Sequence, residues 1–149
     1  MVILVFGDGD ELEALKDDAE NLDNIVFKGR IPKQCIPSVL SQGYVSILHN
    51  SSTDLDKYGQ SQNKFFEYLA AGHPILMTYS VGHSVIRNNG CGVELDTQSS
   101  DAIAQAIVSL CSLTDSEYQN YCKNAAECVK RYDYRELCNQ LISVIKKFL

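Results

Sequence analysis

Short apolar runs rich in β-branched residues recur along the first two thirds of the chain. These runs predict β-strands, and they lie at residues 2–6, 24–29, 44–49, 74–79 and 91–95. The first run, VILVF, is apolar at every position, which is typical of a strand buried on both faces of a sheet.

Amphipathic segments separate the runs. They predict helices over 10–20, within 31–42, from about residue 63 and over 82–88. In the first of these helices, which is acidic, Leu12 and Leu15 are expected to face inward. Pro32 or Pro37 suits the start of the second helix, and the polar segment 50–62 predicts a loop.

Only helical patterns follow the last predicted strand, at residues 99–113, 114–132 and 133–149. A Ser or Asp is the expected cap of the first of these helices. Thr114 and Glu117 have the spacing of a capping box, and Asp133 and Glu136 repeat it.

Strands that alternate with helices predict the α/β class. We expect a Rossmann-like, doubly wound parallel sheet with helices on both faces and further helices at the C-terminal end. The 149 residues suit one domain spanning 1–149. Ligands of such sheets bind beyond the carboxyl ends of the strands, so the loops of interest are 7–10, 28–32, 49–63 and 79–84.

Composition narrows the classes of function. The chain is 45% hydrophobic and 21% charged, as expected for a globular protein. Its net charge of −6 argues against a general nucleic-acid surface, because binding the phosphate backbone requires a basic footprint. A local site for a small anionic ligand remains compatible with this charge.

Neither a membrane span nor a signal peptide is predicted, since no apolar run approaches about 20 residues and no basic region opens the chain. The six cysteines form no CxxC pair, which favours reduced, mostly buried thiols in a cytosolic protein. Cys122 and Cys128 have no further ligands at metal spacing, so no metal site is expected.

The first loop reads GDGDE. It lacks the third glycine of a dinucleotide fingerprint, because position 12 is Leu12, and it lacks the lysine of a P-loop. It also lacks the ligand pattern of an EF-hand. Gly7 and Gly9 therefore serve either a tight structural turn or a close approach of the backbone to a ligand.

Two further loops carry candidates with two interpretations each. In FKGRIP, Gly29 ends a strand, and Arg30 is either a solvated side chain or part of a pocket wall. In VGH, Gly82 either exposes N–H groups to an anion or makes an ordinary turn.

The stretch SQNKFFEYLAAGHP holds the fourth candidate. Ser61 or Asn63 is a plausible N-cap, and Lys64 lies in the first turn, where the helix dipole disfavours a cation unless an anion binds there. Glu67 follows one turn later and could accept hydrogen bonds from a vicinal diol such as a ribose. The alternative is a surface pair of Lys64 with Glu67, worth at most about 0.5 kcal/mol.

Taken in order, GDGDE, VFKGRIP and SQNKFFEYLAAGHPIL resemble motifs of the group 1 (family 4) glycosyltransferases of GT-B fold. The resemblance covers about residues 1–135, and the third motif is its most specific part. It implies that the chain is a fragment of the C-terminal, nucleotide-sugar-binding domain. Such enzymes transfer a sugar from a nucleotide donor with retention at the anomeric carbon, usually without a metal or other cofactor.

The resemblance assigns roles residue by residue. Glu67 would accept the ribose hydroxyls. The start of the helix would face the diphosphate with Ser61, Asn63 and Lys64. The base would be bordered by Gly29, Arg30 and Ile31, while Gly7 and Gly9 would line the cleft floor, and Gly82 is a further candidate for nucleotide-sugar binding. No catalytic residue is assigned.

Several family features are missing. An E-x7-E motif would place its first Glu at Gly59, and Gln62 replaces the usual proline, which predicts a less rigid loop. The N-terminal acceptor domain and the βα unit that grips the diphosphate also have no counterpart. The chain alone is therefore expected to lack transferase activity.

The implied full-length protein would be a hexosyltransferase of bacterial surface polysaccharide or glycoconjugate synthesis, with a UDP- or GDP-sugar as donor. It would be cytoplasmic, with peripheral contact to the inner membrane. The alternative is a non-catalytic α/β module, either receiver-like or a degenerate glycosyltransferase domain. Asp8 and Asp10 half satisfy the receiver pattern, whereas His49 and Asn50 stand where that pattern needs an Asp.

Overall fold

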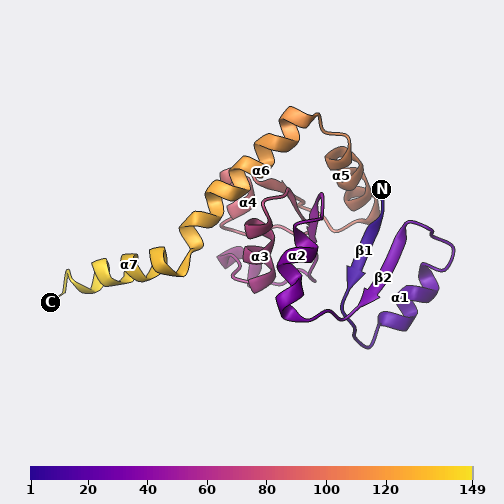
Figure 1. Cartoon of the computed structure of the whole chain (residues 1–149), viewed down its shortest axis with the longest axis horizontal. Coiled ribbons are helices and arrows are strands. Elements are labelled where there is room, and N and C mark those ends of the chain that lie inside the picture. Colours follow the sequence, from indigo (N-terminus) through magenta and orange to yellow (C-terminus); the bar gives the residue numbers. More distant parts are fainter. Residues whose placement is uncertain (149) are drawn as a thin grey trace. The chain divides into compact units, whose positions relative to one another are not determined.

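The computed structural model describes residues 1–148, and these residues divide into two compact units. The first unit is Met1–Val39 and the second begins at Leu40 (Figure 1). Each unit is built from parallel strands joined by helices. The predicted α/β class is confirmed, and the strands lie in two sheets rather than one.

The first unit is a parallel β-α-β arrangement. Strand β1 (Ile3–Phe6) pairs with β2 (Ile25–Gly29), and α1 (Leu12–Asp18) connects them. The 3₁₀ helix η1 (Lys33–Cys35) and α2 (Ile36–Leu40) follow, with Pro32 as the N-cap of η1. The predicted elements of this unit are present with slightly shorter bounds.

The prediction that the first strand is buried on both faces is wrong. Burial alternates along β1, and Leu4 and Phe6 are 50% and 37% exposed. Leu15 of α1 is also exposed, against the expectation that it faces inward. The physical reason is size, because a two-stranded sheet with one connecting helix offers too little surface to cover every apolar side chain.

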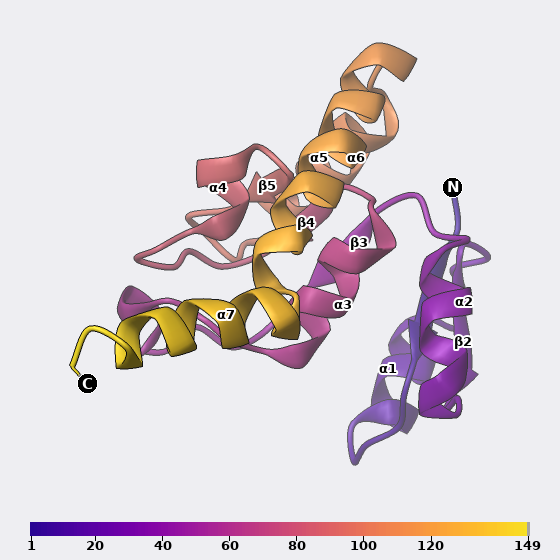
Figure 2. The same cartoon turned by 60° about the vertical axis from the view of Figure 1, so that its left-hand side comes forward.

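The second unit has a three-stranded parallel sheet. Its strands are β3 (Ser46–Leu48), β4 (Ile75–Met77) and β5 (Gly92–Glu94), with β4 in the middle. The loop between β3 and the next helix contains the 3₁₀ helix η2 (Asp56–Tyr58). The helices are α3 (Asn63–Ala71), α4 (Val85–Asn89), α5 (Ser100–Cys111), α6 (Asp115–Val129), η3 (Lys130–Tyr132) and α7 (Tyr134–Ile145) (Figure 2).

The central strand explains the stability of this unit. All three residues of β4 are completely buried, and Phe65 and Leu69 of α3 pack in the same core. Helix α3 also packs against α6. The continuous burial of β4 is what its uninterrupted apolar sequence predicts.

Side-chain caps fix the helix starts. Ser99 caps α5, and the capping box of Thr114 and Glu117 is formed at the start of α6, as predicted. The second predicted box is only half formed. Asp133 accepts from the Arg135 N–H at 2.8 Å, whereas Glu136 accepts from Gln140.

No disulfide joins the six cysteines, all of which lie among residues 1–148, and the prediction that most of them are buried is wrong. Cys91, which lies between α4 and β5 in the chain, and Cys128 of α6 are buried in the core, and Cys35, Cys111 and Cys138 are exposed. Burial raises the pKa of the Cys91 thiol to about 12. These two buried thiols therefore behave as small apolar core residues.

Candidate functional site

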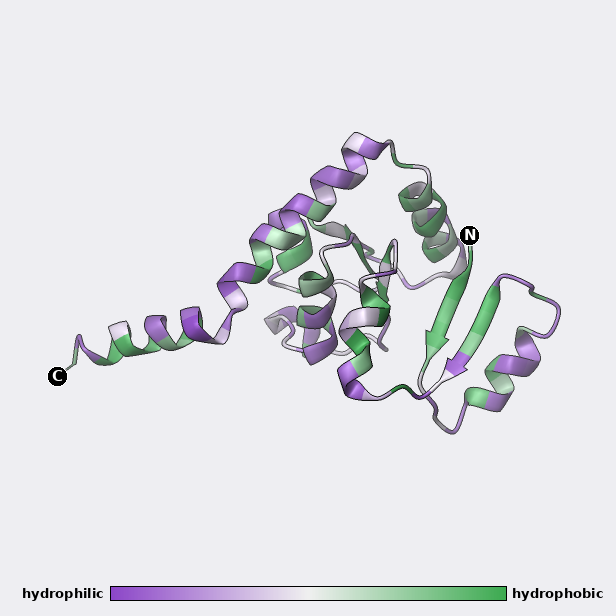
Figure 3. Ribbon diagram, viewed as in Figure 1, coloured by the Kyte–Doolittle hydropathy of each residue, from purple (hydrophilic) through white to green (hydrophobic). Residues whose placement is uncertain are grey.

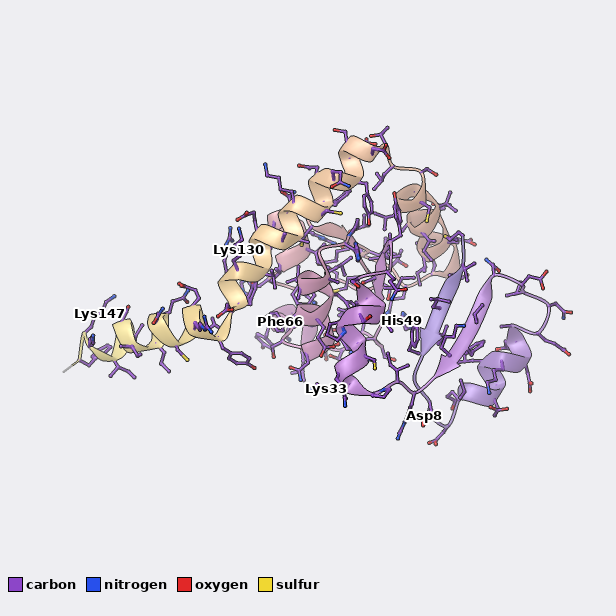
Figure 4. The ribbon with its side chains drawn as sticks, in the orientation of Figure 1. Asp8, Lys33, His49, Phe66, Lys130 and Lys147 are labelled. Carbon is purple, nitrogen blue, oxygen red and sulfur yellow. The ribbon has the colours of Figure 1, made fainter. Side chains whose placement is uncertain are left out.

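The carboxyl ends of β1 and β2 bring together three predicted residues of the first unit, Gly7, Gly29 and Arg30. The Gly7 N–H donates to the Gly29 carbonyl at 2.9 Å. Arg30 Nε lies 2.6 Å from Asp8 Oδ2, in the loop that follows β1 (Figure 4). The Arg30 side chain is 80% exposed, so this ion pair contributes little to stability and leaves the guanidinium accessible.

Glycine is needed at this edge for its backbone conformation. Gly7 and Gly29 have φ of 126° and 67°, which side-chain-bearing residues rarely adopt. A Cβ on either residue would meet nothing within 4 Å, so the backbone is open on that side. Ile31 is half-buried beside them. The loop can therefore approach a flat ligand closely.

The start of α3 is the central feature of the second unit. Gln62, rather than Ser61 or Asn63, is the N-cap, and no side chain caps the helix. Because the first N–H groups of a helix lack intrahelical partners, this end carries partial positive charge and unoccupied donors. Lys64 adds a full charge to the same turn and is exposed.

Glu67 and Lys64 do not form the surface pair that was the alternative interpretation. No ion pair within 4.0 Å joins them among residues 1–148. Glu67 is half-buried, and its charge contributes, after burial, to a raised pKa of the neighbouring Tyr68 hydroxyl. Both side chains are therefore available to a ligand.

Tyr79 holds the segment that leads into α3. Its buried hydroxyl donates to Gln60 Oε1 at 2.7 Å and accepts from Gln62 Nε2 at 3.3 Å. Burial, followed by the charge of Asp56, raises the pKa of Tyr79. These contacts fasten residues 60–62 to the end of β4, in place of the rigidity that a proline at position 62 would give.

Glu94 organises the loop between β4 and α4. Its side chain is completely buried and accepts from Ser80 Oγ, the Val81 N–H and Ser84 Oγ. Arg87 Nε lies 3.2 Å from the same carboxylate, and Arg87 also pairs with Asp96. A buried carboxylate with this many donors fixes the backbone around it.

Gly82 matters because it has no side chain, and not because its N–H group is free to bind a ligand. Its N–H donates to the Asp56 carbonyl at 2.9 Å, so it is not available to an anion. A Cβ at position 82 would lie 1.8 Å from the Lys57 carbonyl oxygen. The glycine is thus required for the close packing of loop 80–84 on η2.

Tyr79 and Glu94 were not among the residues that the sequence singled out. A tyrosine at the end of an apolar strand and a glutamate in a short strand carry no motif of their own. The only available signal was position, since both lie at carboxyl ends of parallel strands.

Two further features bear on other classes of function. Within the described residues there is no group of three or more His, Cys, Asp or Glu that could hold a metal ion. Across the same residues, no helix combines the length and apolar character that crossing a membrane requires.

The parallel strands and the helices that connect them place the chain in the α/β class. The family described as "Glycosyl transferases group 1" matches residues 1–112. The chain belongs to this family of glycosyltransferases.

A solved structure supports the same assignment at the level of the fold. The crystal structure of WaaG, "a glycosyltransferase involved in lipopolysaccharide biosynthesis", superposes with a TM-score of 0.66 at 16% sequence identity. The superposition covers 97% of this chain and 38% of WaaG, so the chain spans well under half the length of that protein. Among curated proteins, no sequence matches the chain.

These comparisons confirm the resemblance to GT-B glycosyltransferases. Two contacts in the structure argue against the receiver-like alternative. The Asp8 carboxylate is engaged by Arg30, and β3 is followed by His49, whose Nδ1 lies 2.7 Å from the Thr78 hydroxyl. The acidic residue after the first strand, Asp8, thus forms an ion pair, and the residue after the third strand, His49, is not acidic.

Proposed function

We propose that this chain is the part of a retaining glycosyltransferase that binds the nucleotide-sugar donor. Family membership supports the reaction class. WaaG, which shares the fold, is involved in lipopolysaccharide biosynthesis, and this supports a role in bacterial surface polysaccharide or glycoconjugate synthesis for the enzyme to which this chain corresponds. We also propose that this enzyme has an acceptor substrate and a separate domain that binds it.

The diphosphate would bind at the start of α3. The observation that carries this assignment is a helix N-terminus without a side-chain cap, beside an exposed Lys64 that has no acidic partner among residues 1–148. Phosphate oxygens satisfy free N–H groups and favour the positive end of the dipole. Ser61 and Asn63, both exposed, would add hydrogen bonds there.

The chemical consequence concerns the leaving group. When the bond between the sugar and the diphosphate breaks, negative charge grows on the departing phosphate. Fixed N–H donors and Lys64 would stabilise that charge more strongly than they stabilise the bound donor, which is the condition for lowering the barrier. No residue of the chain is assigned as an acid or base.

Glu67 would bind the ribose. A half-buried carboxylate without an ion partner in the described part of the chain can accept two hydrogen bonds from the vicinal hydroxyls. Gly29, Arg30 and Ile31 would border the base, and Gly7 and Gly9 would let it approach the backbone. Gly82 contributes by shaping loop 80–84.

The test is a titration of the chain with UDP, GDP and ADP, followed by amide NMR shifts. We expect shifts at residues 7–9, 29–31 and 61–67, and weaker binding in Glu67→Ala. Glu127→Ala removes a carboxylate from the exposed side of α6 and serves as the matched control. Equal affinities of the two variants, or shifts confined to other residues, would overturn the assignment of Glu67. Absence of any shift would favour a degenerate domain.

A further inference from the structure

The two glutamines that precede α3 meet at one buried hydroxyl. Tyr79, two residues beyond the end of β4, is 1% exposed. Its hydroxyl donates to Gln60 Oε1 at 2.7 Å and accepts from Gln62 Nε2 at 3.3 Å. Gln60 is held at a second point, because its Nε2 donates to the Met77 sulfur at 3.1 Å. These side-chain hydrogen bonds tie the segment that enters α3 to the end of β4.

Burial alternates along this segment. Gln60 and Gln62 are half-buried, whereas Ser61 between them is exposed. Gln62 has φ of −72° and ψ of 134°, which is extended backbone. Because alternate side chains of extended backbone point to the same side, both glutamines reach the Tyr79 hydroxyl and Ser61 does not.

Gln62 carries this anchoring into the helix. It is the N-cap of α3, and its carbonyl accepts from the Phe65 N–H at 3.0 Å. Phe65 is completely buried, whereas Asn63 and Lys64 are exposed. Helix α3 accordingly shows both hydrophobic and hydrophilic residues in Figure 3. The first N–H groups of α3 are therefore placed by two anchors, the core contact of Phe65 and the hydrogen bond between Gln62 and Tyr79.

We propose that Tyr79 is a positioning residue of the donor site, and that its hydroxyl holds the start of α3 in the geometry that binds the diphosphate. This inference rests on the proposed function and adds to it a residue that does not touch the ligand. Donors that are already in place bind an anion more tightly, because the segment does not have to be ordered on binding. Such donors also stabilise the charge of a departing diphosphate without reorganisation.

The test compares variants by their affinity for inorganic pyrophosphate, UDP and GDP, measured from amide NMR shifts. Tyr79→Phe keeps the buried ring and removes only the hydroxyl. We expect it to weaken binding by about tenfold, since the segment must then be ordered on binding. Tyr118→Phe is the matched control, because the Tyr118 hydroxyl also has two hydrogen-bond partners, the Tyr44 carbonyl at 3.0 Å and His73 Nδ1 at 3.2 Å. This control should bind as tightly as the parent chain.

A proline at position 62 supplies a readout that a loss of stability alone would not move. Its ring holds φ near about −65°, close to the −72° of Gln62. In the Tyr79→Phe background, Gln62→Pro should therefore restore most of the lost affinity without restoring the hydroxyl. Hydrogen exchange of the Phe65 amide in the free chain should be about tenfold faster in Tyr79→Phe and near the parent rate in the double variant.

Gln62→Met provides a second route to the same contact and leaves Tyr79 intact. It removes one of the two partners of the Tyr79 hydroxyl at a similar side-chain length. Because Gln60 still holds the segment, we expect a smaller loss of affinity than in Tyr79→Phe, about threefold.

Three results would overturn this inference and leave the proposed function intact. Tyr79→Phe could bind as tightly as the parent chain, Tyr118→Phe could lose as much affinity as Tyr79→Phe, or Gln62→Pro could restore nothing. A parent chain that binds neither pyrophosphate nor either nucleotide would instead overturn the proposed function, and this inference with it.

Discussion

Glu94 illustrates how one buried charge can define a loop. Its carboxylate receives two hydroxyls, one backbone N–H and the Arg87 guanidinium, and these groups lie on both sides of the turn between β4 and α4. Removing the charge would leave these donors with a weaker acceptor in a place that water does not reach. The shape of loop 80–84 is therefore tied to one side chain.

We expect Glu94→Gln to lower the free energy of unfolding by about 2 kcal/mol, since hydrogen bonds to charged groups contribute more than neutral ones. Asp96→Asn is the control, because Asp96 is the other partner of Arg87 but is 79% exposed. Urea unfolding followed by circular dichroism measures both. The interpretation fails if Glu94→Gln is as stable as the parent chain, or if the two variants lose equal stability.

At the scale of single residues, the sequence predicted site positions where a motif existed. Glu67, Lys64 and Arg30 were singled out in that way, and their role in donor binding stays a prediction. Arg30 follows β2, whereas Lys64 lies in the first turn of α3 and Glu67 lies one turn later. The N-cap of α3 could not be identified, because Gln62 has the required backbone conformation without a capping side chain. Tyr79 and Glu94 were missed because their importance lies in contacts with residues distant in sequence.

Among the elements, α6 shows that a local signal can fix a boundary. The Thr114 hydroxyl accepts from the Glu117 N–H, and the Glu117 carboxylate accepts from Thr114 in return. These hydrogen bonds lower the pKa of the Glu117 carboxyl. Both partners are within three residues of each other, so the sequence alone was sufficient to predict them.

Thr114→Ala should destabilise the chain by about 1 kcal/mol at neutral pH, the usual effect of losing a helix cap. A lowered carboxyl pKa stabilises the fold above the unfolded pKa of that group, and this contribution disappears as pH falls through the folded value. The difference between variant and parent should therefore shrink in acid. Ser116→Ala, in the same turn, should leave stability nearly unchanged in thermal unfolding at both pH values. A pH-independent difference would contradict the role of Glu117.

At the scale of the elements, the sequence could not predict whether both faces of each strand are buried. An apolar run such as VILVF predicts a strand, yet whether both of its faces are covered depends on what packs beside it. In β4 the neighbouring strands and α3 complete the burial. In β1 the two-stranded sheet leaves Leu4 and Phe6 exposed.

On the scale of the whole molecule, the motifs that resemble those of the family are spread along the chain. Gly7, Gly29 and Arg30 belong to the first unit, and Lys64 and Glu67 belong to the second. Order along the chain, rather than any single loop, identified the fold, because family motifs recur at the ends of successive strands. The family match covers residues 1–112, a range that includes all three motifs.

The most direct test of donor binding is a comparison of two ligands with two proteins. Isothermal titration would measure the affinity of the preferred nucleoside diphosphate and of its 2′-deoxy analogue, for the parent chain and for Glu67→Ala. If Glu67 binds the ribose hydroxyls, the parent chain should bind the deoxy analogue about tenfold or more weakly, whereas Glu67→Ala should bind both ligands equally. The same loss of affinity in both proteins would show that Glu67 does not contact the ribose and would contradict the proposed orientation of the donor.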